Sequence, residues 1–530
     1  MTTTSTPAPA HGAPSRTADL AAFVAGGLAA ALGIAIGELI AGLIFGAPSL
    51  VIAIGDFVID NQPPGAKEIV VDIFGDTKPV LTTGITITSI LIAGVLGVLG
   101  RRNWLVPVVG FVVAGLIGVV AALSQPLYDP LLSIITVGIA IGAALAVLRL
   151  MLSATAPAWA APPTPTGPAD EMPDWDRRGF LRTSGGVAAG AIVMGVLGRN
   201  LLVNRPGGAD PDVELPTAAG PAPEVPTGAD LDVPGITPIV VPNDDFYQID
   251  TALVSPRVNA ADWSLRIHGL VDREVTLTYD DLSSMPLFEQ YVTISCVSNR
   301  VGGNLVGNAL WTGVDLRDVL DMAGVKPEAD QIASRSVDGW DCGFPTSWAM
   351  DPERKPMIAL GMNGSPLPVD HGYPARLIIP GLYGYVSATK WLSEIELTTW
   401  DAFDGYWIPR GWAKEAPILT QSRIDTPRGG TLLERDTAVP IAGVAWAVDR
   451  GIQGVEVSID EGEWQPAEIS DPLSDATWVQ WVLDWTPTER GPHRIKVRAI
   501  DGTGEVQTAE VTRPDPDGAR GHHEIVVTVA

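Results

Sequence analysis

Cysteine is nearly absent from this sequence: its 530 residues include only two, Cys296 and Cys342. Two thiols are too few for a disulfide framework, a zinc site of the CxxC type or an iron–sulfur cluster. Histidine is also scarce, with six residues, and none lies in the apolar runs described below. Because a bis-histidine haem needs two such ligands, we expect no haem in the apolar segments.

Basic side chains are also few, with 34 Lys and Arg against 61 Asp and Glu. Residues 1–204 hold 10 basic and 12 acidic side chains, and the remaining residues hold 24 and 49. The acidic excess therefore lies in the second part of the chain, which would repel the phosphates of nucleic acids and anionic lipids. We expect no nucleic-acid partner.

Charged residues are sparsest in four long apolar runs, at about 20–45, 81–100, 104–125 and 131–151. Each run is near the ~20 residues that a helix needs to cross a bilayer, and the mean hydropathy of the chain is +0.23. We predict a disordered tail over 1–18 and a four-helix transmembrane region over 19–151. Buried core helices of a soluble protein are the alternative.

A Pro- and Ala-rich linker over 152–176 leads to the paired arginines Arg177 and Arg178. Phe180, Leu181 and a weakly apolar stretch follow, and the segment 177–203 resembles a twin-arginine export signal. The alternative is an ordinary basic flank of a membrane helix. Because four crossings return the chain to the cytoplasm, we predict that 177–203 is an uncleaved signal and a fifth transmembrane helix in a bacterial cell membrane. The remainder is then extracytoplasmic.

Beyond a Pro- and Gly-rich linker over 204–235, the composition is that of globular domains. Residues 236–415 alternate short strand-like runs with helices such as DLRDVLDMAGV, which is typical of an α+β domain. Residues 416–530 show period-two alternation between turns, which predicts a β-sandwich.

Two segments of the α+β region carry chemistry. Cys296 follows the strand-like run YVTIS and stands near Arg300, which favours a thiolate. His371, Arg376 and Lys390 surround a Gly-rich strand and turn, an arrangement suited to an anion such as phosphate. The alternatives are a buried structural cysteine, a salt-bridged hairpin, or a protease with Cys296 as nucleophile and His371 as base.

From about residue 240 to its end, the chain resembles the sulfite oxidase family of molybdopterin enzymes with its immunoglobulin-like dimerisation domain. The matching stretches are DFYQIDT, SLRIHGLV, CVSNR with WTGVDL, DHGYPARLIIPGLYG with KWL, GVAWAVDRGIQGVEVSIDEGEWQPA and WVQWVLDW with GPHRIKVRAIDGTG. The expected fold is a transmembrane helix bundle, an α+β molybdopterin-binding catalytic domain over 236–415 and an immunoglobulin-like β-sandwich over 416–530.

The resemblance implies that Cys296 ligates the molybdenum of a molybdenum–molybdopterin cofactor. It also implies cofactor contacts for a larger set of residues: Asp244, Tyr247, Gln248, Asn299, Ser336, His371, Arg376, Ser387 and Lys390. The segment between Arg376 and Lys390 is one residue longer than in close family members.

The sequence departs from the family where the substrate would bind. Gln248 and Val301 stand at places where the family has arginines, and Trp412 stands in place of the catalytic tyrosine. Arg300 remains, and Arg450 matches the arginine that the second domain offers. Each lost charge-assisted contact is worth roughly 1.5–3 kcal/mol, so a sulfoxide, handled in the reducing direction, is as well matched as sulfite.

Three further expectations concern partners. The apolar segments carry no electron-transfer ligands, so a separate electron carrier is needed. The family implies a homodimer through the last domain, although its Trp-rich strands could instead pack on the catalytic domain. A non-catalytic cell-surface binding protein on the same scaffold is the alternative from another functional class.

Overall fold

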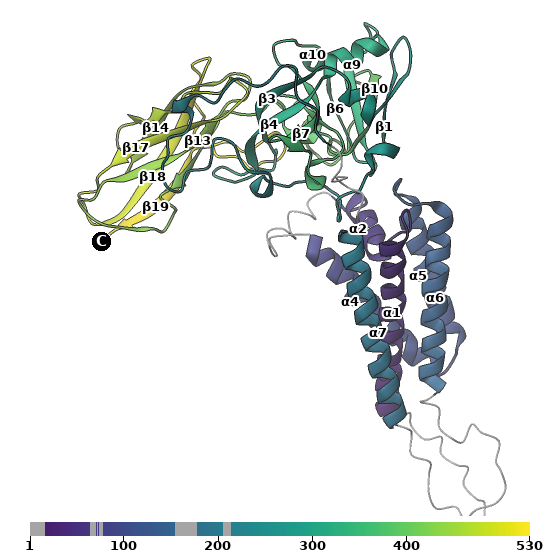
Figure 1. The fold of residues 1–530 in the computed structure, drawn as a ribbon. Helices are drawn as coiled ribbons and strands as arrows, with labels where there is room; N and C mark the ends of the chain where they lie inside the picture. Colours follow the sequence, from purple (N-terminus) through teal and green to yellow (C-terminus); the bar gives the residue numbers. More distant parts are fainter. Residues whose placement is uncertain (1–15, 64–69, 71–72, 74–77, 154–176, 205–213) are drawn as a thin grey trace, which may run out of the picture. The chain divides into compact units, whose positions relative to one another are not determined.

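The computed structural model describes residues 16–63, 70, 73, 78–153, 177–204 and 214–530. The predicted tail 1–18 and linker 152–176 fall almost wholly outside these residues, as does 205–213 of the predicted linker 204–235. The chain divides into two compact units, which are coloured along the sequence in Figure 1 and described separately below: Met1–Arg205 with Ala252–Val254, and Pro206–Thr251 with Ser255–Ala530.

The first unit is helical. Among the residues that the structure describes, five helices are long and apolar enough to cross a membrane: α1 (Arg16–Leu43), α4 (Lys78–Gly100), α5 (Leu105–Leu123), α6 (Pro130–Ser153) and α7 (Arg177–Val203). They correspond to the four predicted runs and the predicted fifth helix. The shorter α2 (Leu50–Asp60) begins at Ser49, whose hydroxyl accepts a hydrogen bond from the Ile52 amide at 3.3 Å.

Small residues allow α1 to lie close to its neighbours. A Cβ atom on Gly26 would lie 2.0 Å from the carbonyl oxygen of Ala93 in α4, and one on Gly42 would lie 2.5 Å from that of Gly198 in α7. Such close backbone approach between apolar helices depends on glycine. The helix that begins with the paired arginines is therefore packed into the bundle.

The second unit begins with two sheets, the first mixed and the second antiparallel. The first has the order β2 (Val275–Thr278), β1 (Ser264–Gly269), β10 (Leu392–Thr398), β5 (Gln331–Ser336) and β6 (Asp341–Pro345). The second has the order β3 (Leu287–Ser295), β4 (Val306–Asp315), β7 (Met357–Met362) and β8 (Ser365–Pro366), with β9 (Arg376–Ile378) also paired to β7.

Short helices precede and connect these strands. They are α8 (Tyr279–Ser283), α9 (Leu316–Ala323), α10 (Thr346–Ala349), α11 (Gly384–Ser387) and the 3₁₀ turns η2 (Thr227–Ala229), η3 (Asn243–Asp245), η4 (Ala260–Asp262) and η5 (Val369–His371). Helix α9 shows how the sequence determines where a helix begins and ends. The Asp315 side chain accepts from the Arg317 amide at 2.9 Å, and Gly324, at φ +73°, ends the helix in the left-handed region.

The last strands form two sheets around one core. One sheet has the order β11 (Gln421–Thr426), β13 (Val439–Trp446), β17 (Val479–Trp485) and β16 (Glu468–Ile469). The other has the order β12 (Leu432–Leu433), β19 (His523–Val529), β18 (Gly491–Asp501), β14 (Ile452–Ile459) and β15 (Gln465–Pro466). The sandwich predicted from period-two alternation is present, and its immunoglobulin-like assignment stays a prediction.

The sandwich and the first two sheets of this unit pack together in one compact unit. Trp446 and Trp478 are fully buried in the same hydrophobic core as Trp311 of β4. The indole nitrogen of Trp478 donates to the Ile239 carbonyl at 2.8 Å. In Figure 1, β19 runs away from the first two sheets to the C-terminus at the far tip of the sandwich. The end of the sandwich opposite the C-terminus thus shares a core with the first two sheets.

Candidate functional site

Cys296 lies directly after β3, in a loop that returns to β4. The Cys296 amide donates to the Leu305 carbonyl at 2.9 Å, and the Asn299 amide donates to the Cys296 carbonyl at 3.0 Å. The Asn299 side chain accepts from the Leu305 amide at 3.0 Å. These bonds close the loop and hold the thiol in place, with 7% of the residue exposed.

Tyr247 lies close enough to Cys296 and to Arg376 for the charge of each to act on it. Burial raises the pKa of Tyr247, the charge of Cys296 raises it further, and the charge of Arg376 lowers it. Burial lowers the pKa of Arg376 to about 10, and Tyr247 opposes that shift. The mutual influence brings together three residues that the sequence assigned to one site, from three distant segments.

Arg376 is a buried cation with incomplete hydrogen bonding. Its Nη1 donates to the His371 carbonyl at 3.0 Å and its Nη2 to the Ala388 carbonyl at 3.4 Å, and the guanidinium lies over the Trp311 ring at 5.0 Å. Its Nε is buried and has no hydrogen-bond partner within the described part of the chain. A buried charge of this kind is stable only when an anion compensates it, so the geometry is that of an anion site.

His371 is held neutral beside it. Its Nε2 lies 3.0 Å from the Asn243 carbonyl, so the proton is on Nε2, and the ring packs edge-on against Phe246 at 5.6 Å. Burial, followed by the charges of Arg376 and Lys390, lowers the pKa of His371 to about 4. The imidazole is therefore a hydrogen-bonding group and not a cation at neutral pH.

Lys390 lies among acidic groups. Its ammonium donates to Asp250 at 2.8 Å and to the Asp370 carbonyl at 2.8 Å. Asp250 therefore already supplies a negative partner for Lys390, and an incoming phosphate would have to share Lys390 with Asp250 or displace Asp250. Asp338 lies near the same pair: burial raises its pKa, and the Asp250 charge raises it further. Sequence reasoning missed the Asp250 carboxylate, although it stands two residues after Gln248.

The other predicted cofactor residues differ in accessibility. Ser336 is buried and accepts from the Asp338 amide at 3.5 Å, and the Ser387 hydroxyl donates to the Tyr383 carbonyl at 3.1 Å. Asp244 is exposed on η3. Gln248 is also exposed and donates to Asp250 at 3.3 Å. The structure thus brings Tyr247, Cys296, His371, Arg376 and Lys390 together, and places Asp244 and Gln248 at the surface.

The predicted catalytic residues lie in different surroundings. Arg300 is exposed on the Cys296 loop. Trp412 is half-buried and packs against Tyr385 at 5.9 Å. Arg450 donates from Nε to Asp501 at 3.1 Å, and its Nη2 donates to the Ile418 carbonyl and the Thr420 hydroxyl, each at 3.1 Å. These hydrogen bonds give Arg450 a structural role in the sandwich, and its catalytic role stays a prediction.

Tyr383 is a residue of the site that sequence reasoning missed. It is buried, its pKa is raised first by burial and then by the charge of Cys296, and its hydroxyl accepts from the Leu419 amide at 3.4 Å. A phenol therefore stands near the thiol, whereas the resemblance assigns the family's tyrosine position to Trp412, which stays a prediction. Its place in the GLYGY turn between Arg376 and Lys390 was the available signal.

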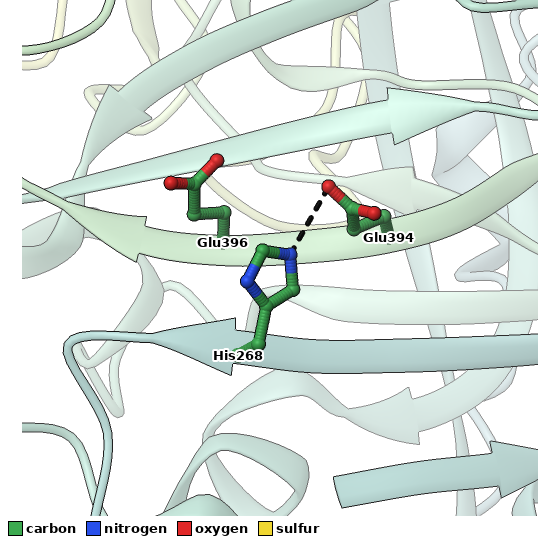
Figure 2. A group of neighbouring side chains, drawn as sticks. All are labelled: His268, Glu394 and Glu396. Carbon is green, nitrogen blue, oxygen red and sulfur yellow. Dashed lines mark ion pairs between the residues drawn. The ribbon is translucent and has the colours of Figure 1, made fainter. Parts of the chain in front are cut away.

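A second group of ligand-type side chains lies on the mixed sheet. Figure 2 shows His268 of β1 beside Glu394 and Glu396 of β10, with ligand atoms within 4.8 Å of one another. Arg335 of β5 contacts Glu394 and donates to Glu396 at 2.8 Å. Its guanidinium already serves as the cation for both carboxylates, so we assign no metal to this group.

Part of the chain is similar to known molybdopterin enzymes. Residues 252–407 match the family described as the oxidoreductase molybdopterin binding domain. The chain is 29% identical over 316 residues to mouse mitochondrial sulfite oxidase, covering 51% of this chain and 57% of that protein. It is 31% identical over 316 residues to the NADH nitrate reductase of Volvox carteri, covering 49% and 36%.

The chain thus spans only about half the length of the curated relatives that it matches. Among solved structures, the sulfane dehydrogenase SoxCD of Paracoccus pantotrophus is similar with a TM-score of 0.47 and 22% identity, over 56% of this chain and 84% of that one. Its matched domain and its sulfite oxidase relatives make this chain similar to the sulfite oxidase family of molybdopterin-dependent oxidoreductases.

Proposed function

We propose that this protein is a membrane-anchored oxidoreductase that transfers an oxygen atom at a molybdenum–molybdopterin cofactor ligated by Cys296. The observation that carries the proposal is the buried guanidinium of Arg376, with an unsatisfied Nε, near Tyr247, which in turn lies near the Cys296 thiol. The family and its sulfite oxidase relatives support an oxidoreductase. The metal ligand and the reaction type are our inference.

The donor set fits such a cofactor. A thiolate is a soft ligand for the metal, and a buried arginine suits a pterin phosphate. His371 and Lys390 would complete the cofactor's polar surroundings, with Lys390 exchanging part of its pairing with Asp250. When bound, the cofactor supplies two-electron oxygen-atom chemistry.

The protein's own residues prepare the site. Arg376 would stabilise negative charge on a bound anion, because it acts from a buried position where screening is weak. His371 keeps its proton on Nε2, fixed by the Asn243 carbonyl, and so presents a fixed ring to its surroundings. The burial of Cys296 limits access of water to the sulfur.

The substrate class is proposed from the positive charges around the site. Gln248 is hydrogen-bonded to Asp250, and Arg450 is engaged by Asp501 and its neighbours. Neither supplies a cation to a dianion such as sulfite. This favours the second candidate, a reductase of a neutral substrate such as a sulfoxide, with Tyr383 as the phenol near the thiol.

The cellular setting completes the proposal. The five apolar helices would anchor the chain, and the twin-arginine signal at Arg177 and Arg178 would export a folded, cofactor-loaded domain. A separate carrier would exchange electrons with the metal. Dimerisation through the sandwich remains the family-based expectation.

The test is the molybdenum content per purified full-length chain, in the wild type and in Cys296→Ser. Cys342→Ser is the matched control, because Cys342 is a thiol 1% exposed whose pKa burial raises to about 12. We expect near one molybdenum per chain in the wild type and the control, and loss of thiolate-to-metal absorption only in Cys296→Ser. Unchanged absorption in Cys296→Ser would refute the ligand assignment. Absence of molybdenum from well-folded wild-type protein would favour a non-catalytic binding protein.

A further inference from the structure

The C-terminal sandwich contacts the Cys296 loop through a buried arginine. Arg423 of β11 is 7% exposed, and its Nη1 donates to the Gly303 carbonyl at 2.9 Å. Its Nε donates to Asp425 at 2.6 Å and its Nη2 to the Thr237 hydroxyl at 2.7 Å. All three nitrogens thus have fixed partners, so the guanidinium holds the Gly303 carbonyl in one position relative to the sandwich.

A histidine of the last strand contacts the neighbouring residue of the same loop. Gly302 has φ +74°, and a Cβ atom there would lie 2.2 Å from the His523 ring. His523 Nδ1 accepts from the Ile424 amide at 2.9 Å, which fixes the ring against β11. Glycine is therefore required at 302 both for the backbone conformation and for the space that the ring occupies.

The strand that leads to Cys296 is tied to the same sandwich. The Thr293 amide of β3 donates to the Ala476 carbonyl at 2.9 Å, and the Trp478 amide donates to the Thr293 hydroxyl at 2.8 Å. The sandwich therefore contacts the polypeptide on both sides of the thiol.

We infer that Arg423 and His523 are positioning residues of the Cys296 site, so that the sandwich sets the geometry of the thiol loop in addition to any role in dimerisation. The inference has two parts. The first, that the sandwich restrains the Cys296 loop, depends on the observed contacts alone. The second, that this restraint orients the metal ligand, rests on the proposed function. The two parts can therefore fail separately.

The first experiment measures alkylation of Cys296 by iodoacetamide in the full-length, cofactor-free chain, produced in cells that cannot make molybdopterin. Arg423→Ala should raise the alkylation rate roughly tenfold or more, which corresponds to the loss of one charge-assisted hydrogen bond. Cys342 is buried elsewhere in the same unit, so its alkylation rate should stay unchanged as long as the protein remains folded. Arg498→Ala is the matched control, because Arg498 is an arginine of the same sandwich that pairs with Glu456 at 2.7 Å.

A second pair of variants tests the histidine contact. Gly302→Ala should also increase Cys296 alkylation, and His523→Ala added to it should restore part of the protection by removing the colliding ring. Arg423→Lys keeps the charge but has only one donor nitrogen, so its Cys296 alkylation rate should lie between those of the wild type and Arg423→Ala. These variants keep the inference testable if Arg423→Ala does not fold.

The loaded protein tests the consequence for the metal. Arg423→Ala should shift the thiolate-to-metal absorption band at unchanged molybdenum content, and Arg498→Ala should not. If Arg423→Ala and Gly302→Ala alkylate at the wild-type rate, the positioning role is wrong, whether or not the wild type binds molybdenum. If alkylation rises but the absorption band does not move, the sandwich restrains the loop without orienting the metal ligand, and that part of the inference is refuted.

Discussion

The neutral His371 makes the stability of the second unit depend on pH in a defined way. Its pKa is about 4 in the folded protein, against an ordinary value of 6.5, because burial and the charges of Arg376 and Lys390 disfavour the imidazolium. At ~1.36 kcal/mol per pKa unit, this difference corresponds to about 3 kcal/mol. Between these two pH values the unfolded chain binds the proton and the folded one does not, so stability falls as pH drops through that interval.

The perturbation is His371→Gln, which keeps a hydrogen-bond donor for the Asn243 carbonyl and removes the titration. The free energy of unfolding of the full-length chain in detergent would be measured by urea titration at about pH 7.5 and about pH 4, with tryptophan fluorescence as the signal. Going to the lower pH, the wild type should lose about 3 kcal/mol more than His371→Gln.

His493→Gln provides a control of opposite sign. Although burial lowers the pKa of His493, its hydrogen bonds to the Glu489 carbonyl and the Asp460 carboxylate raise it overall. That histidine stabilises the fold at low pH, and its contribution is lost as pH rises through the folded pKa. The reasoning about His371 is refuted if the wild type and His371→Gln lose the same free energy.

Three further predictions follow from buried contacts. Arg376→Met should lower the pterin and molybdenum recovered per chain, because the buried cation for the phosphate is gone; full recovery would contradict that role. Gly42→Leu should destabilise the helical unit by about 1–3 kcal/mol in a detergent thermal melt, because its Cβ would lie 2.5 Å from a carbonyl of α7, whereas Gly84→Leu points into open space and should have little effect. Arg450→Met removes the cation beside the buried Asp501, which keeps its hydrogen bonds from Thr420 and Thr503, and should cost about 1.5–3 kcal/mol at an unchanged KM; a large rise in KM with unchanged stability would instead place Arg450 at the substrate.

Local sequence pattern predicted the elements of this protein well. Apolar runs of membrane length became α1, α4, α5, α6 and α7, because a helix has to be apolar along its whole length to face lipid. Period-two alternation predicted the sandwich strands for an equally local reason. Cys296 was placed correctly at the end of a strand, since a run of β-branched and aromatic residues before a Gly-rich turn is a strand signal.

Which distant residues meet was decided only by the tertiary structure. Resemblance selected His371, Arg376 and Lys390, but the pairing of Lys390 with Asp250 depends on a segment 140 residues away. Likewise Arg450 follows the end of β13, and its surroundings are set by Asp501 on another strand.

The contact of His523 with Gly302 joins the last strand to a loop more than two hundred residues earlier. Periodicity reports which face of an element is buried, and it carries no information on the partner that buries it. The sequence by itself therefore determined the helices, the strands and the type of chemistry. The packing of distant segments decided which side chains surround the thiol, because burial and charge at a site are properties of the assembled neighbours.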